Sequence, residues 1–308
     1  MSKDIKDRVR GVAVGAAIGD ALGMPLEFCN ASPNGCFITG MQDGRLERGS
    51  FTDDTEMALA LADSLLAHKS LNEPDLTERF LAWYKAEPPD VGIHTSNVLE
   101  QIMTGESWET AASSVQSRYP ESAGNGSIMR CWPVAIAASH DLALLEDLSR
   151  RQSRVTHAHE ECTAGCAYVN RVIVHLLHGV DPYSAYEKAL AETPMTEGLH
   201  NVIKLAPNRR REELRNTGWV RHTIESAVWG LLSTTSFEEC LIQVINLGAD
   251  ADTAGTVAGA FAGAYYGLSS IPQDWISVLH GPWPVRSDNV LYKDNLVRIA
   301  DELTDSLT

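Results

Sequence analysis

Cysteine is scarce in this sequence. Its 308 residues include six cysteines, and no two of them form a Cys-x-x-Cys pair. A disulfide framework or a structural zinc site requires cysteines that are more numerous or more closely spaced. We therefore expect a protein of the reducing cytoplasm.

Basic residues and long apolar runs are also scarce. Lysine and arginine number 25 against 41 acidic residues, a net charge of −16, and such a field repels phosphate backbones and anionic lipids. Asp20 ends the apolar run at residues 11–19, and the run at residues 254–271 consists mostly of small residues. We expect no nucleic-acid partner and no membrane span, and a closely packed core helix at the second run.

Strand patterns are rare, whereas apolar residues recur at helical spacing. This spacing occurs at residues 57–65, 76–83, 169–176 and 241–245. Helix stops are predicted at Pro88-Pro89, at Gly179 with Pro182, at Gly198, at Gly267 and at Pro272. No linker or repeat divides the chain. The sequence thus predicts an all-α protein with one domain over residues 1–308.

Two helix starts are unusually acidic. Residues 49–56 place Thr52, Asp53 and Asp54 before an apolar stripe, and residues 246–253 end in Asp250, Asp252 and Thr253. Helix capping accounts for one or two of these carboxylates. It does not account for the second cluster, because residues 253–273 carry no charge and no lysine or arginine lies nearby in sequence.

Oxygen ligands from aspartate and threonine favour Mg²⁺ or Mn²⁺ over Zn²⁺. Four carboxylates are enough for two ions about 3.5–4 Å apart. We therefore expect a divalent-metal site, and an acidic cluster without a cation of its own. Polar or glycine-rich segments lead into apolar stretches at Asp20, Thr52, Asn125 and Asp250, so one site assembled from several helix starts is predicted.

Other candidate residues each have an ordinary structural interpretation. Asp90 follows two prolines and fits a turn. The glycine-rich turn that begins at Gly124 offers backbone amides to a pyrophosphate, but such turns are often only turns. His157, with His159 and Cys162, resembles a set of zinc ligands, although a capped helix start with a hydrogen-bonded histidine explains it equally well.

Seven motifs in one order resemble the ADP-ribosylglycohydrolase family. They lie at residues 15–28, 49–57, 90–92, 124–130, 155–157, 218–223 and 248–255. The resemblance implies an all-α orthogonal bundle with two Mg²⁺ or Mn²⁺ ions in a cleft. It also implies cleavage of the bond between ADP-ribose and an acceptor.

The resemblance assigns roles by position. It implies metal ligation by Thr52, Asp53, Asp54, Asp250, Asp252 and Thr253. Glu27 is implied as a further ligand or gate, with Asp90, Glu27 and Asp54 as the catalytic carboxylates. Contacts with substrate are implied for Gly92, Gly124, Asn125, Gly126, Ser127, His157 and Trp219, the last by stacking on adenine, although a core tryptophan is an alternative.

The expected substrate is an ADP-ribosylated protein and the expected product is ADP-ribose. Arginine linkage is the first choice, because a guanidinium acceptor needs a carboxylate partner such as Asp90. The sequence departs from the family pattern at Ile93-His94 and at Trp219, so serine-linked protein, an O-acyl ADP-ribose and a modified nucleic-acid end stay open. A protein that mainly binds ADP-ribose or occludes an ADP-ribosyltransferase is the alternative of another class.

Overall fold

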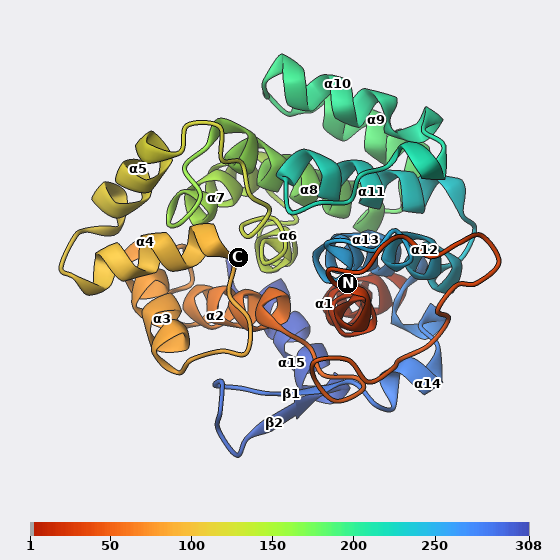
Figure 1. Cartoon of the computed structure of the whole chain (residues 1–308), viewed down its shortest axis with the longest axis horizontal. Helices are drawn as coiled ribbons and strands as arrows, with labels where there is room; N and C mark the ends of the chain where they lie inside the picture. The colour runs from red at the N-terminus through yellow and green to blue at the C-terminus, as the bar shows by residue number, and fades with distance from the viewer. Residues whose placement is uncertain (1–2, 308) are drawn as a thin grey trace.

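A computed structural model describes residues 3–307 of the chain (Figure 1). The secondary structure of the described residues is almost wholly helical, as the sequence predicts. The α-helices are α1 Lys3–Gly23, α2 Asp53–His68, α3 Glu73–Lys85, α4 Ile93–Met103, α5 Trp108–Arg118, α6 Trp132–Ala137, α7 Leu142–Arg154, α8 Glu160–Leu177, α9 Pro182–Glu192, α10 Glu197–Leu205, α11 Val220–Ser233, α12 Phe237–Ile245, α13 Ala251–Tyr266, α14 Gln273–Ile276 and α15 Lys293–Thr304.

Short elements complete the described chain. The 3₁₀ helices are η1 Met24–Leu26, η2 Ala206–Asn208, η3 Arg211–Glu213 and η4 Leu268–Ser270. Strands β1 His280–Pro282 and β2 Val290–Tyr292 pair antiparallel, with His280 opposite Tyr292. This small ribbon lies at the edge of the helical body (Figure 1).

Helices α1 and α13 form the centre of the bundle and run antiparallel. Glycines spaced four apart on each helix face one another, with Gly11 against Gly263 and Gly19 against Gly255. A Cβ atom added at Gly19 would lie 1.9 Å from the carbonyl oxygen of Gly255. Only glycine therefore permits this approach of the two backbones, and the pairing fixes the register of the helices.

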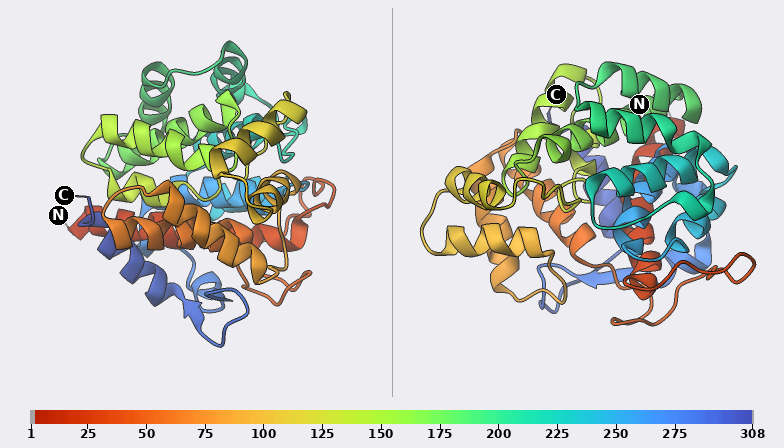
Figure 2. Two further views of the ribbon diagram at one scale, coloured as in Figure 1. Left: turned by 90° about the vertical axis from the view of Figure 1, so that its left-hand side faces the viewer. Right: turned by 45° about the horizontal axis from the view of Figure 1, so that its top comes forward.

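The antiparallel pairing positions the site. It brings the C-terminal end of α1 beside the N-terminal end of α13, and α2 starts next to both. In Figure 1 α1 and α13 are seen nearly end-on, while α2, α8 and α11 run across the view; Figure 2 shows the bundle from two other sides. The all-α orthogonal bundle of the sequence prediction is confirmed.

One helical segment, residues Asp4–Leu26, is long and apolar enough to cross a membrane, with a mean hydropathy of 1.3. However, 83% of its most apolar window is buried inside the protein. Its composition is explained by packing against α13. Most of the second apolar run lies in α13. This helix ends before Gly267, whose positive φ of 83° terminates it.

The four periodic segments are confirmed as α2, α3, α8 and α12. Three other expectations were wrong. Gly198 does not stop a helix but is the second residue of α10. Asp20 lies in the last turn of α1 rather than at a helix start. Asn125 lies in consecutive turns, and α6 begins only at Trp132, where Pro133 sets the helix start.

Candidate active site

A cleft of about 760 Å³ opens where α2, α4 and α13 begin. Most of the residues singled out in the sequence line it. They are Glu27, Asp53, Asp54, Asp90, Gly92, Gly124, Asn125, Gly126, His157, Asp250, Asp252 and Thr253. Thr52, Ser127 and Trp219 are not in its lining. The fold thus brings residues from all seven motifs to one cleft, the 218–223 motif through Gly218.

The two acidic helix starts meet at the floor of this cleft. Thr52 and Asp250 are the N-cap residues of α2 and α13, but neither side chain caps its own helix. The hydroxyl of Thr253 lies 3.5 Å from Asp54 Oδ2, a contact between residues 199 apart in sequence. Capping therefore does not explain these side chains, and the carboxylates are left facing one another.

Asp20 organises the start of α2 and was missed by the sequence reasoning. Its buried carboxylate accepts hydrogen bonds from the backbone N–H and hydroxyl groups of both Thr52 and Thr55, at 2.6 to 3.1 Å. It thus satisfies donors at the first turn of α2 from outside that helix. The signal that could have revealed it is a lone acid at the end of the apolar stretch of α1, which the sequence pattern assigned to a helix start.

The buried carboxylates at the helix starts are held in an unfavourable electrostatic environment. Burial first, and neighbouring carboxylates second, raise the pKa of Asp53, Asp54 and Asp252 well above the usual range. Burial likewise raises the pKa of Glu27 to about 7, against the hydrogen bond to Asp252 that lowers it. Asp54 Oδ1 is buried without a hydrogen-bond partner. A hard divalent cation fits this donor set, because it would satisfy the oxygen and neutralise the charge.

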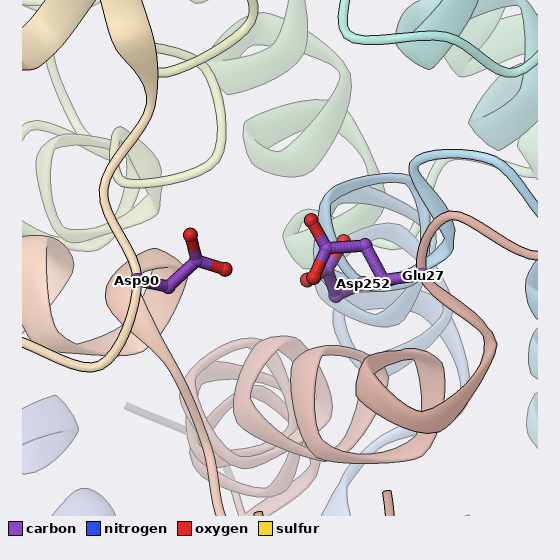
Figure 3. A group of neighbouring side chains, drawn as sticks. All are labelled: Glu27, Asp90 and Asp252. Atoms are coloured by element: carbon purple, nitrogen blue, oxygen red, sulfur yellow. The ribbon is translucent and has the colours of Figure 1, made fainter. Parts of the chain in front are cut away.

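Glu27, Asp90 and Asp252 form a second arrangement that could hold a metal ion (Figure 3). One carboxylate oxygen of each lies within 4.8 Å of the others, and among residues 3–307 no other group of histidine, cysteine and acidic side chains meets this condition. Asp90 approaches from the segment before α4, whereas Glu27 and Asp252 approach together from the opposite wall. Asp252 belongs both to this group and to the six implied ligands, and Glu27 was implied as a further ligand or gate.

The structure corrects the expectation that the acidic cluster has no cation of its own. Arg45, in the loop between η1 and α2, lies 2.5 Å from Asp90, 2.7 Å from Glu27 and 3.4 Å from Asp252. The sequence reasoning missed it because only basic residues beside the second acidic helix start were considered. The loop brings Arg45 close to Asp252 although the two residues are 207 positions apart in sequence.

The glycine-rich turn forms the far wall of the cleft. Asn125 donates to Thr223 Oγ1 at 2.9 Å and to Asp250 Oδ2 at 2.7 Å, so the turn is tied to the start of α13. His157 lies directly beneath it, and a Cβ atom at Gly126 would be 2.9 Å from the imidazole. Burial lowers the pKa of His157 well below its usual range. The histidine therefore presents a neutral ring to the cleft.

The other histidine alternative is settled by hydrogen bonds. His159 Nδ1 accepts from the N–H of Glu161 and caps α8, and Cys162 Sγ donates to the carbonyl of Gly124. His157 Nδ1 pairs with the hydroxyl of Thr156. His157, His159 and Cys162 each form a hydrogen bond with a different partner. The capped helix start is therefore the interpretation that fits.

Two predicted substrate contacts lie outside the lining. Ser127 is fully buried: its hydroxyl accepts from Ser153 and its carbonyl accepts from Gln152, so it does not reach the cleft. Trp219 lies on the surface, 38% exposed, with the Arg221 guanidinium 4.7 Å from its ring centroid. Its backbone pairs with Gly124 across an antiparallel bridge, which keeps the ring beside the glycine-rich turn.

An apolar lip at the cleft was not predicted. Phe28 and Ile93 both line the cleft, and each is 82% exposed. Phe28 has a left-handed φ of 62°, which its backbone hydrogen bond of 2.6 Å to Ala249 holds in place. Exposed apolar side chains beside buried acids indicate a surface that contacts a ligand or partner.

Such a fold and cleft define an all-α protein with a buried acidic site that could hold a metal ion, next to a glycine-rich turn. A sequence profile described as ADP-ribosylglycohydrolase matches residues 1–307. The chain belongs to the ADP-ribosylglycohydrolase family, and it is an enzyme that hydrolyses a glycosidic bond.

Individual relatives agree with this assignment. The ADP-ribosyl-[dinitrogen reductase] glycohydrolase of Rhodospirillum rubrum is 36% identical over 282 residues, covering 89% of this chain and 91% of the relative. The ADP-ribosylarginine hydrolase Tri1 of Serratia proteamaculans is 33% identical over 284 residues, covering 89% and 75%. A solved structure titled ADP-ribosylglycohydrolase-related protein complex superposes over both whole chains with a TM-score of 0.84 and 30% identity.

Proposed function

We propose that this enzyme removes mono-ADP-ribose from arginine side chains of proteins in the cytoplasm, and that residues 1–308 work as one domain. The observation that carries the acceptor assignment is that Asp90 and Glu27 already hold a guanidinium, that of Arg45. Two of the relatives described above are named for ADP-ribosylarginine or ADP-ribosylated dinitrogen reductase as substrate. The products are ADP-ribose and an unmodified arginine.

The proposed cofactor is a pair of Mg²⁺ or Mn²⁺ ions. The residues that would hold them are Thr52, Asp53, Asp54, Asp250, Asp252 and Thr253, with Glu27 at the edge of the set. When bound, such ions supply charge stabilisation and orient the ribose hydroxyls and a water. The unpartnered Asp54 Oδ1 and the raised pKa values of the buried aspartates support this assignment.

The remaining chemistry is assigned to the side chains of the cleft. Asp90 pairs with the acceptor guanidinium and holds the leaving group in line with the glycosidic bond. Glu27, beside Asp252, is assigned to transfer a proton between water and the leaving group. Hydrolysis places the hydroxyl of water on the anomeric carbon and its proton on the departing guanidine nitrogen. The hydroxyl of Thr253 donates to Asp54 Oδ2 and thereby orients this carboxylate.

The nucleotide end of the substrate is assigned to the far wall. The backbone amides of Gly124 and Gly126 are assigned to the diphosphate, whereas the N–H of Asn125 already donates to the carbonyl of Gly218. The neutral His157 beneath them adds no charge. Gly92 keeps the wall next to Asp90 free of a side chain. Trp219 is assigned to adenine from its place beside this turn.

The test is release of ADP-ribose, measured by chromatography, from arginine-linked, serine-linked and O-acyl substrates. Purified protein is stripped with a chelator and then supplied with Mg²⁺, Mn²⁺ or Zn²⁺. We expect turnover of the arginine-linked substrate with Mg²⁺ or Mn²⁺, none after chelation, and poor activity with Zn²⁺. Preference for a serine or acyl linkage would refute the acceptor, and full activity in chelator with no bound metal would refute the ligand set.

A further inference from the structure

Arg45 is the cation at the centre of the cleft's acidic residues. Its guanidinium is 2.5 Å from Asp90 on one wall and 2.7 Å from Glu27 on the other, while the contact with Asp252 is longer at 3.4 Å. The side chain is 28% exposed. A single arginine thus spans the gap between the two walls that Figure 3 shows.

The loop that carries Arg45 is fastened at both ends. Ile38 exchanges hydrogen bonds with the side chain of Asn246, and Gly49 and Phe51 pair with the backbone of His280. Between these anchors, in the part of the chain that the structure describes, the main-chain hydrogen bonds of residues 39–48 stay within the loop. The backbone beside Arg45 packs on η1, where a Cβ atom at Gly44 would lie 2.9 Å from the Cα atom of Pro25. The Arg45 side chain beyond it is held by its ion pairs.

One partner of Arg45, Asp90, is the carboxylate assigned to the acceptor guanidinium, and Glu27 faces it across the gap. Asp90 accepts a hydrogen bond from Arg45 Nη1, and Glu27 Oε2 forms an ion pair with Arg45 Nη2. The arginine of a modified protein would need the same carboxylate charges. One gap cannot hold two guanidinium groups, because their charges repel and their planes compete for the same oxygens. Binding of the acceptor thus requires Arg45 to leave.

We propose that Arg45 is a displaceable occupant of the acceptor subsite, a latch that closes the gap between Asp90 and Glu27 until the arginine of a modified protein replaces it. This inference rests on the proposed function. An internal competitor lowers the apparent affinity for the external ligand by the fraction of time that it is bound. The latch thereby disfavours weak guanidinium ligands and admits those that are also held through ADP-ribose.

The experiment compares wild type with Arg45→Gln, which keeps a polar side chain but removes the charge. Agmatine, a free guanidinium probe, is titrated into Mg²⁺-loaded protein by calorimetry. If Arg45 occupies the subsite about 90% of the time, its removal should tighten agmatine binding about tenfold. The KM for an ADP-ribosylated arginine substrate should fall while kcat changes little, and affinity for Mn²⁺ should rise, because a positive charge beside Asp252 has been removed.

Arg48→Gln is the matched control, since Arg48 lies in the same loop and its side chain makes no ion pair within residues 3–307. It should leave agmatine affinity, KM and Mn²⁺ affinity at wild-type values. Arg45→Lys should fall between wild type and Arg45→Gln, because an ammonium keeps the charge but not the fork. Thermal melts verify that each variant is folded.

Unchanged or weaker agmatine binding by folded Arg45→Gln would overturn the latch, as would a fall in kcat at constant KM, which would make Arg45 a positioning residue for Asp90. The titrations with agmatine and Mn²⁺ do not require turnover. If wild type fails to hydrolyse arginine-linked substrate, the proposed function fails by itself. If wild type hydrolyses it and Arg45→Gln resembles Arg48→Gln, the latch fails by itself.

Discussion

The side-chain amide of Asn125 donates a 2.7 Å hydrogen bond to Asp250 Oδ2. These residues are 125 positions apart, and the bond joins the glycine-rich turn to the acidic start of α13. The same amide also donates to Thr223 Oγ1. One side chain therefore couples the place assigned to the diphosphate with the place assigned to the metal ions.

Replacing Asn125 with alanine should weaken both functions together. A lost hydrogen bond to a charged group costs about 1.5–3 kcal/mol, or roughly tenfold to a hundredfold in affinity. Calorimetric titration of ADP-ribose and of Mn²⁺ into Asn125→Ala should show both losses. A variant that loses ADP-ribose affinity at unchanged Mn²⁺ affinity would show that the bond to Asp250 has no part in holding the metal ions.

Asp54 and Asp90 should respond differently to conversion into asparagine. Asp54→Asn should reduce bound metal and activity together, and it should raise the stability of chelated protein by removing a charge from a crowded site. Asp90→Asn should keep metal affinity and fold while turnover of the arginine-linked substrate falls. Metal analysis, melting and kinetics on both variants measure this separation. Wild-type turnover by Asp90→Asn would remove Asp90 from the catalytic residues.

Stability of the chelated protein should fall as the pH rises. Burial raises the pKa of Glu56 from 4.5 to about 7 in the folded chain, although its hydrogen bond from Trp83 lowers it. The folded protein holds the Glu56 proton more tightly than the unfolded chain does. The contribution of this proton to the free energy of unfolding is therefore complete below pH 4.5 and is lost as the pH approaches 7.

The corresponding variant is Glu56→Gln, which stays neutral and still accepts from Trp83. At pH 8 it should be more stable than wild type by about 3 kcal/mol, the free energy equivalent of that pKa change. Urea unfolding at several pH values in chelator gives the comparison. Glu100→Gln, an exposed carboxyl bonded to the Tyr84 hydroxyl, is the control that should follow wild type. If the free energy of unfolding of wild type and of Glu56→Gln changed in parallel with pH, the prediction would be contradicted.

The contact between α1 and α13 should tolerate no side chain. Gly19→Ala would place a methyl group 1.9 Å from the Gly255 carbonyl oxygen, and overpacking of this kind costs about 1–3 kcal/mol or more. Mn²⁺ affinity should fall too, since these helices align the acidic residues. Gly40→Ala is the control, because its nearest neighbour would be 4.0 Å away. Equal urea midpoints for the two variants would refute this account of the packing.

Trp219 is expected to stack on adenine despite its place outside the cleft lining. Loss of the ring in Trp219→Ala should weaken ADP-ribose binding by roughly 1–3 kcal/mol, about tenfold to a hundredfold, and Trp219→Phe should restore much of it. Calorimetry with ADP-ribose provides the measurement. If folded Trp219→Ala binds as tightly as wild type, the ring serves only its contacts with Arg221 and His222.

Local patterns were enough to predict much of the fold. The apolar spacing in α2, α3, α8 and α12 and the breaker residues around them gave the helices, because helical periodicity is a property of neighbouring residues. The failures at Gly198, Asp20 and Asn125 have one cause. A glycine or an acid resembles a helix boundary in sequence, but burial and hydrogen bonds from other segments decide whether the helix continues.

The sequence by itself determined the all-α class, the order of the motifs and the residue types that can bind a divalent cation. The tertiary structure decided which of them meet. The close approach of Gly19 and Gly255 set the register of α1 and α13, the carboxylate of Asp20 took over the start of α2, and a loop brought Arg45 between Asp90 and Glu27. These contacts join residues far apart along the chain. Their energies depend on distance and burial in space, which composition and spacing along the chain do not contain.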